Sequence, residues 1–78
     1  MAHYQLDARR LLCPLPVIRT QDRVKQLLPG DVLDIVATDP GVLQDIPAWA
    51  RLNGHRLLTT RREGWEVWVT LTVGQQEN

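Results

Sequence analysis

The sequence predicts an α+β fold, a two-layer α/β sandwich with two helices on one face of a four-stranded mixed sheet. Segments with helix and strand patterns alternate and then end in two consecutive strands, in the order βαβαββ. Clusters of Pro–Gly, Asp–Pro–Gly and Glu–Gly separate these segments. The 78 residues can build only one modest core. We therefore expect a single domain over residues 1–78, with flexible ends at 1–3 and 74–78.

The first third of the chain predicts a strand and an amphipathic helix. Residues 4–7 have a short strand pattern, and the helical pattern runs from Pro14 until Pro29-Gly30 stops it. Prolines at 14 and 16 suit a first helical turn, where their fixed φ fits and an N–H is not needed. Apolar residues recur at helical spacing and define the expected buried face: Val17, Ile18, Val24, Leu27 and Leu28.

The middle of the chain predicts a buried strand and a second helix. Residues 31–38 are rich in Val, Leu and Ile, and Asp39-Pro40-Gly41 then marks a turn. We expect the helix over residues 45–52, because Pro47 is tolerated only near a helix start. Asp45 is then the expected N-cap and Gly54 the residue that ends the helix. Trp49, at helical spacing with Ile46 and Leu52, is expected in the core.

The last third predicts two strands, residues 56–62 and 65–73, joined at Glu63-Gly64. In the final strand, apolar residues from Trp65 to Val73 alternate with a second series that includes Trp68. Trp65 and Trp68 are therefore expected on opposite faces, with one of the two partly exposed. We expect the first two strands, joined through a helix, to be parallel or at least not a hairpin pair, and the last two to form an antiparallel hairpin.

Charge and composition exclude several classes of protein. Nine basic and nine acidic residues balance, which argues against a general nucleic-acid binder. No apolar run approaches the roughly 18 residues of a membrane span. The single cysteine cannot form an internal disulfide, so the chain is expected in a reducing, cytoplasmic setting.

Cys13 is the residue that suggests chemistry. It stands in Leu11-Leu12-Cys13-Pro14-Leu15-Pro16, at the expected start of the first helix. Most lone cysteines are buried apolar side chains. At a helix start, however, free N–H groups and the positive end of the macrodipole favour a thiolate. Five basic residues against two acidic ones up to Gln26 add to this, so we expect a lowered thiol pKa, with Arg9, Arg10 and Arg19 as supporting residues.

The remaining residues narrow the chemistry. His3 and His55 are the only histidines, and both are far from Cys13 in the sequence, so the chain does not clearly offer the base of a Cys–His hydrolase or the ligand spacing of a metal site. Dithiol redox catalysis needs a second cysteine, which the sequence lacks. One exposed thiolate can carry sulfur as a persulfide or be oxidised as a sensor. We expect no metal and no cofactor. Two of the flanking leucines are expected to be buried, and any exposed one is a candidate docking contact: Leu11, Leu12 and Leu15.

Residues 6–16, with Cys-Pro-x-Pro at 13–16, resemble the N-terminal signature of the TusA/SirA-like sulfur carrier family. The resemblance extends over residues 6–71 through further segments: Pro29-Gly30-Asp31, Thr38-Asp39-Pro40-Gly41, Asp45-Ile46-Pro47-Ala48-Trp49 and Gly54-His55. It implies the same βαβαββ sandwich, and a Cys13 thiolate that takes sulfane sulfur from a cysteine desulfurase or rhodanese-like donor. Arg10 departs from the family's usual glycine and costs about 1 kcal/mol if φ is positive there.

The first hypothesis is therefore a monomeric persulfide carrier acting through Cys13, rather than a multi-turnover enzyme, with Pro14 and Pro16 fixing the thiol. Its protein acceptor could serve tRNA thiolation, molybdenum-cofactor chemistry or sulfur oxidation. The second hypothesis is a non-catalytic regulatory module that uses the same helix start as a protein contact. A third, RNA binding, is weakened by the neutral charge and the lack of a stacking aromatic array.

Overall fold

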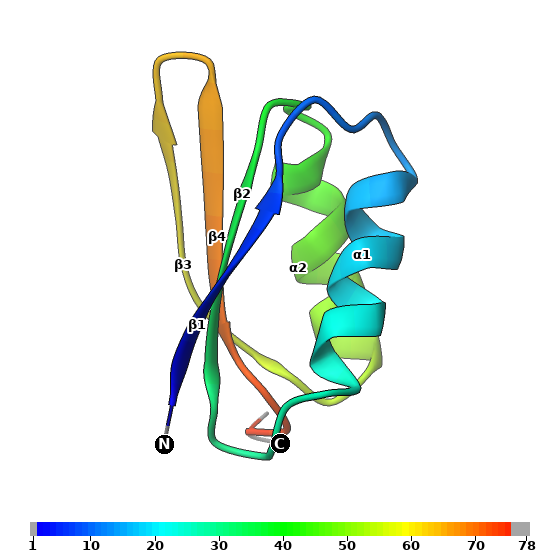
Figure 1. The fold of residues 1–78 in the computed structure, drawn as a ribbon, viewed down its shortest axis with the longest axis vertical. Coiled ribbons are helices and arrows are strands. Elements are labelled where there is room, and N and C mark those ends of the chain that lie inside the picture. Colours follow the sequence, from blue (N-terminus) through cyan, green and yellow to red (C-terminus); the bar gives the residue numbers. More distant parts are fainter. Residues whose placement is uncertain (1, 76–78) are drawn as a thin grey trace.

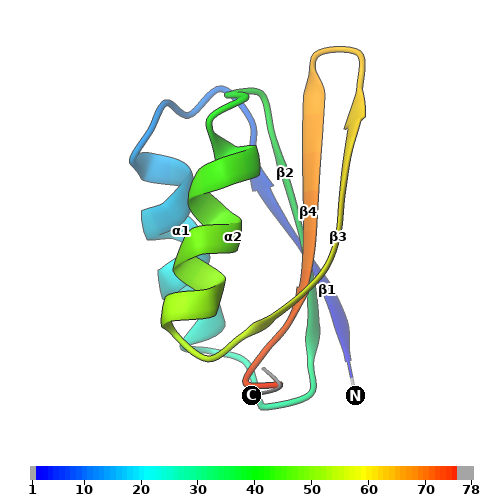
Figure 2. The ribbon, with the colours of Figure 1, turned by 180° about the vertical axis from the view of Figure 1, so that it is seen from behind.

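The computed structural model describes residues 2–75 and confirms the order βαβαββ. The elements are β1 His3–Ala8, α1 Leu15–Val24, β2 Val32–Ala37, α2 Val42–Leu52, β3 Arg56–Glu63 and β4 Glu66–Thr72. Both helices lie against the same face of the sheet, which confirms the two-layer sandwich (Figures 1 and 2). Neither helix is long and apolar enough to span a membrane.

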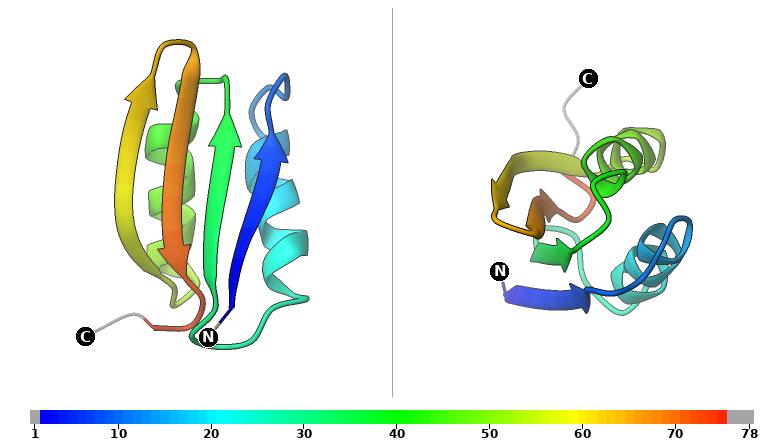
Figure 3. Two further views of the ribbon diagram at one scale, coloured as in Figure 1. Left: turned by 60° about the vertical axis from the view of Figure 1, so that its left-hand side comes forward. Right: turned by 90° about the horizontal axis from the view of Figure 1, so that it is seen from above.

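The sheet is mixed, with the strand order β1-β2-β4-β3 (Figure 3). β1 and β2 are parallel, as predicted, with Leu6 opposite Ile35. β4 runs antiparallel to both β2 and β3, which confirms the predicted hairpin. The two strands richest in buried residues, β2 and β4, therefore lie at the centre of the sheet, and β1 and β3 form its edges.

The core lies between the central strands and the helices. Alternate residues of a strand point to the same face, so every second residue of β2 and β4 points toward the helices. Helix α1 adds Pro16 and Thr20, and the Thr20 hydroxyl donates a hydrogen bond to the Pro16 carbonyl (2.8 Å). The fully buried apolar side chains of the centre are Leu33, Ile35, Val67, Val69, Leu71, Val42, Ile46 and Ala50.

Helix α1 corrects the predicted apolar face. It begins at Leu15 with Pro14 as N-cap and ends at Val24, before the predicted stop. Pro16 and Thr20, four residues apart, set the buried side of the helix. Ile18 and Leu28 were expected on the buried face but are 47% and 71% exposed, because Ile18 lies on another side of α1 and Leu28 lies beyond the end of the helix. The other predicted members pack partly against the core: Val17, Val24 and Leu27.

Helix α2 begins three residues earlier than predicted, at Val42, with Gly41 as N-cap. Asp45 therefore lies in the first turn and is not the cap, and Pro47 lies inside the helix. Pro47 lacks the N–H that would bond back to the Leu43 carbonyl, and its ring crowds that carbonyl. Burial of Val42 and Ile46 in the core offsets this cost.

The end of α2 follows the prediction. Gly54 has φ +78°, the left-handed conformation that glycine adopts without a Cβ penalty. The His55 N–H then donates to the Ala50 carbonyl (2.8 Å), the bond that closes a Schellman turn. Trp49 is half-buried, packs against the core and stacks on the His55 ring with centroids 5.0 Å apart. Leu52, in contrast, is 85% exposed.

The β3–β4 hairpin corrects the position of Trp65. Glu63 pairs with Glu66, so Gly64 and Trp65 form the two-residue loop. Gly64 has φ +59°, which suits the first position of such a loop. Trp65 is 91% exposed and lies outside β4, so its predicted place within the strand was wrong, while the expectation that one of Trp65 and Trp68 is exposed is confirmed. The inward series begins at Val67 instead.

The two ends of the chain are described only in part. His3 belongs to β1, and the Gly74 N–H donates to His55 Nδ1 (2.9 Å). The expectation of flexible ends also covers residue 1 and residues 76–78, which lie outside the described residues.

Arg10 has φ +66°, the only positive φ at a non-glycine position among the described residues. Its backbone N–H donates to Thr38 Oγ1 (2.9 Å), which ties the β1–α1 loop to the end of β2. A side chain in this conformation costs roughly 1–2 kcal/mol because Cβ approaches the following carbonyl oxygen. The structure thus places arginine where the backbone favours glycine.

We expect Arg10→Gly to raise the free energy of unfolding by about 1 kcal/mol, because relief of this strain exceeds the entropy that glycine adds to the unfolded chain. Urea unfolding measures the change. Arg10→Ala is the matched control, since it removes the guanidinium and keeps the strained Cβ. A glycine variant no more stable than the alanine variant would show that the strain is negligible.

Candidate functional site

Cys13 lies in the β1–α1 loop, immediately before α1, and its side chain is exposed. Three connections gather at this end of the molecule: the β1–α1 loop, the β2–α2 loop and the β3–β4 hairpin (Figure 1). Pro14 is the N-cap of α1, joined to Cys13 by a cis peptide bond, and Pro16 is the second helical residue. The structure therefore places the thiol at the helix start, as the prolines indicated.

The start of α1 does not offer the free N–H groups that the sequence analysis expected. The Leu15 N–H donates to the Leu12 carbonyl (2.9 Å), and the Val17 N–H donates to the Pro14 carbonyl (3.1 Å). Pro14 and Pro16 have no N–H to offer. The prolines that position the thiol thus remove part of the expected anion-stabilising environment.

Two aspartates from the β2–α2 segment face Cys13 instead. The Cys13 N–H donates to Asp39 Oδ2 (3.0 Å), while Asp39 Oδ1 accepts the Gly41 N–H (2.9 Å). The Cys13 thiol Sγ donates to Asp45 Oδ2 (3.1 Å). The backbone and the side chain of Cys13 are therefore both held by carboxylates of one segment.

These carboxylates shift the pKa of the Cys13 thiol in the direction opposite to the expected one. The hydrogen bond to Asp45 raises the Cys13 pKa above its ordinary value, and partial desolvation and the negative charges of Asp45 and Asp39 raise it further. The expectation of a lowered pKa was wrong. Counting charges near Cys13 in the sequence could not reveal carboxylates 26 and 32 residues further along the chain.

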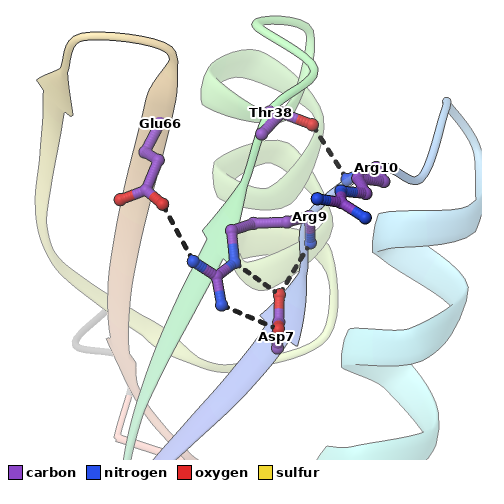
Figure 4. A network of polar contacts seen from close by, with 5 residues as sticks. All are labelled: Asp7, Arg9, Arg10, Thr38 and Glu66. Atoms are coloured by element: carbon purple, nitrogen blue, oxygen red, sulfur yellow. Dashed lines mark hydrogen bonds and ion pairs between the residues drawn. The ribbon is translucent and has the colours of Figure 1, made fainter.

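The predicted supporting arginines do not contact the thiol. Arg9 pairs with Asp7 and with Glu66 of β4, each at 3.0 Å (Figure 4). Both pairs raise the Arg9 pKa, and the hydrogen bonds from Arg9 lower the pKa of Asp7 to about 2. Arg10 bonds Thr38 through its backbone, and Arg19 is exposed on α1. Among the described residues, neither of these two side chains forms a hydrogen bond or ion pair with Cys13.

The surroundings of the thiol are open. A hollow of about 530 Å³ lies nearby, lined by Asp7, Arg9, Arg10, Thr38, Trp65 and Glu66, and Cys13 is not part of its lining. Within residues 2–75, no group of His, Cys, Asp or Glu side chains is arranged to hold a metal ion. This geometry suits a thiol that meets another macromolecule better than one that acts in an enclosed cleft.

Exposed apolar side chains stand on both sides of the thiol along the chain, and we call them the α1 patch: Leu12 of the β1–α1 loop, and Leu15 and Ile18 of α1. Their side chains are 73%, 45% and 47% exposed. Only Leu11 of the three flanking leucines packs against the core, so the expectation that two would be buried was wrong. Leu15 and Ile18 lie three residues apart on one helix face. Sequence reasoning named the leucines but missed Ile18, because it assigned that residue to the buried face.

The fold and this site define a small α+β domain with one exposed thiol at a helix start. The family described as "Sulfurtransferase TusA" matches residues 4–71. This chain therefore belongs to the TusA family. A SirA-like protein from Desulfitobacterium hafniense has the same fold, with a TM-score of 0.79 and 23% identity, over 92% of this chain and 99% of that one.

Sequence relatives carry similar names. The putative sulfur carrier protein YrkF of Bacillus subtilis is 49% identical over 59 residues, which cover 76% of this chain and 32% of that protein. The chain thus spans about a third of the length of that relative. The sulfur carrier protein TusA of Allochromatium vinosum is 40% identical over 60 residues, which cover 77% of this chain and 79% of that protein.

The raised pKa predicts how Cys13 reacts with iodoacetamide, which alkylates only the thiolate. We expect the midpoint of the rate against pH to be higher in the native chain than in the chain denatured in guanidinium, where the carboxylates no longer face the thiol. Mass spectrometry of the carbamidomethylated chain measures the rate, and Cys13→Ser gives the background. A lower midpoint in the native chain would mean that cationic groups dominate the site.

Proposed function

We propose that this protein is a sulfur carrier that accepts sulfane sulfur on Cys13 as a persulfide and passes it to an acceptor protein. Membership of the TusA family and the names of the relatives support this role. The observation that carries the proposal is the exposed Cys13 thiol, presented by the Cys-Pro-x-Pro turn at the start of α1.

The transfer is chemically balanced without a cofactor. The Cys13 thiolate attacks the outer sulfur of a donor persulfide R–S–SH, the donor S–S bond breaks, and R–S⁻ leaves and takes up the thiol proton. The products are Cys13–S–SH and R–SH, with no net oxidation. The chain has no second cysteine to displace this sulfur as a disulfide, so the persulfide persists until an acceptor thiolate attacks it.

The partners in this proposal are proteins. A cysteine desulfurase or a rhodanese-like protein supplies the sulfur, and the α1 patch, adjoining the thiol, is where such a partner docks. The monomer is the acting form, in a reducing cytoplasm where a lone thiol survives. The acceptor pathways named above are all compatible with this chemistry.

The proposal predicts sulfur loading on one residue. After incubation with a cysteine desulfurase and cysteine, or a rhodanese and thiosulfate, intact mass spectrometry is expected to show a gain of ~32 Da that reductant removes. Cys13→Ser is expected to fold normally and gain nothing. If neither donor loads the wild-type chain, and Cys13→Ser keeps partner binding and biological activity, the non-catalytic module becomes the correct function.

The docking role of the α1 patch can be tested separately from thiol chemistry. We expect Ile18→Asp to slow loading from a protein donor severalfold, because a charge replaces apolar contact area, while iodoacetamide alkylation of Cys13 stays unchanged. Leu28→Asp is the matched control, since Leu28 is 71% exposed on the segment that leads to β2. Equal slowing in both variants would exclude the patch as the docking surface.

A further inference from the structure

Asp45 is the side chain that touches the sulfur of Cys13, at 3.1 Å, and the sulfur-carrier proposal assigns it no role. Its position in the first turn of α2 is firmly set. Val42 and Ile46, on either side of it along the chain, are 1% and 0% exposed in the core. The carboxylate is therefore carried by a helix that is anchored in the core and not by a free surface loop.

Cys13 is held on the same segment through its backbone. Asp39 accepts hydrogen bonds from the N–H groups of both Cys13 and Gly41, which joins the β1–α1 loop to the N-cap of α2. Thiol and carboxylate thus approach each other from two segments that are tied together directly beside the contact. The distance between Sγ and Asp45 is a property of the packed fold.

In the empty carrier this contact favours the protonated thiol. The thiol donates its proton to a hydrogen bond with Asp45, and an ionised sulfur at that distance would meet a negative charge instead. The charged groups that bond Cys13 are Asp45 from α2 and Asp39 from the β2–α2 loop, and among the described residues no cationic side chain forms a hydrogen bond with the thiol.

In the loaded carrier the same contact becomes unfavourable. Sγ is then bonded to the outer sulfur and has no proton to donate, so the hydrogen bond to Asp45 is lost. The outer sulfur of a persulfide is a stronger acid than a thiol and carries negative charge near neutral pH. Asp45 and Asp39 repel that charge, because like charges a few ångströms apart in a partly desolvated site raise each other's free energy.

We propose that Asp45 stabilises the empty form of the carrier relative to the loaded form and so biases the protein toward releasing its sulfur. This inference rests on the sulfur-carrier function proposed above. The equilibrium concerned, with both persulfides ionised, is Cys13–SH + R–S–S⁻ ⇌ Cys13–S–S⁻ + R–SH, in which one sulfur atom moves and protons, charge and electrons balance. Asp45 shifts this equilibrium to the left, because it accepts a hydrogen bond from the thiol of the empty form and repels the charge on the persulfide of the loaded form.

The test compares the wild-type chain with Asp45→Asn, which removes the charge and keeps the side-chain shape. Each protein is equilibrated with a fixed ratio of 2-mercaptoethanol and its persulfide, a pair without charged groups beyond the sulfur itself. Intact mass spectrometry then measures the ratio of loaded to empty carrier. We expect this ratio to rise severalfold in Asp45→Asn, and the alkylation midpoint of the empty thiol to move to lower pH.

Asp22→Asn is the matched control, because it makes the same charge change on an exposed position of α1 with no contact to Cys13. It is expected to behave as the wild-type chain. Far-UV circular dichroism checks that each variant is folded. Asp45→Ser, which also removes the charge and leaves a small polar group in the helical turn, gives a second reading of the same ratio.

The outcomes separate the two proposals. A wild-type chain that loads sulfur, with an unchanged ratio in both folded Asp45 variants, overturns the role of Asp45 and leaves the carrier function standing. An equal rise in Asp22→Asn also overturns it, because net charge alone would then explain the shift. A wild-type chain that takes sulfur from no donor overturns the carrier function and, with it, this inference.

Discussion

The burial of helix α2 against the two central strands is the packing on which the rest of the structure depends. Val42, Ile46 and Ala50, at helical spacing, are all within 1% of complete burial. They fill the space above alternate residues of β2 and β4, which supply most of the remaining core. Burial of this kind contributes about 25 cal/mol per Å² of apolar surface, and it carries a helix that contains an internal proline.

This packing also builds the functional end of the molecule. Because α2 is fixed on the sheet, its first turn and the loop before it hold Asp45 and Asp39 in place beside the Cys13 loop. Arg10 joins the same arrangement by its N–H bond to Thr38, at the cost of a left-handed backbone. The thiol is thus positioned by groups from three separate stretches of the chain, although its own side chain remains open to solvent.

An open thiol with a raised pKa suits a carrier whose empty form waits for a docked partner. A strongly ionised thiol exposed to solvent would react with many oxidants and electrophiles, whereas a protonated one is comparatively inert. The apolar side chains beside it, Leu12, Leu15 and Ile18, add area that a partner can cover. Selectivity can then come from docking, because only a docked donor or acceptor brings its own sulfur close to Cys13.

The sequence by itself determined the order of the elements, the parallel and antiparallel pairings, the family and the thiol at a helix start, because these follow from local periodicity, turn residues and a contiguous motif. It misplaced the start of α2, since proline statistics do not include the burial that offsets a lost hydrogen bond. It also placed Ile18 on the buried face of α1 and Trp65 inside the last strand, because the phase of a helix and the exact turn of a hairpin depend on what they pack against. Only the tertiary structure decided the charge around Cys13, since Asp39 and Asp45 reach the thiol through folding, while the neighbouring Arg9 turns away to Asp7 and Glu66.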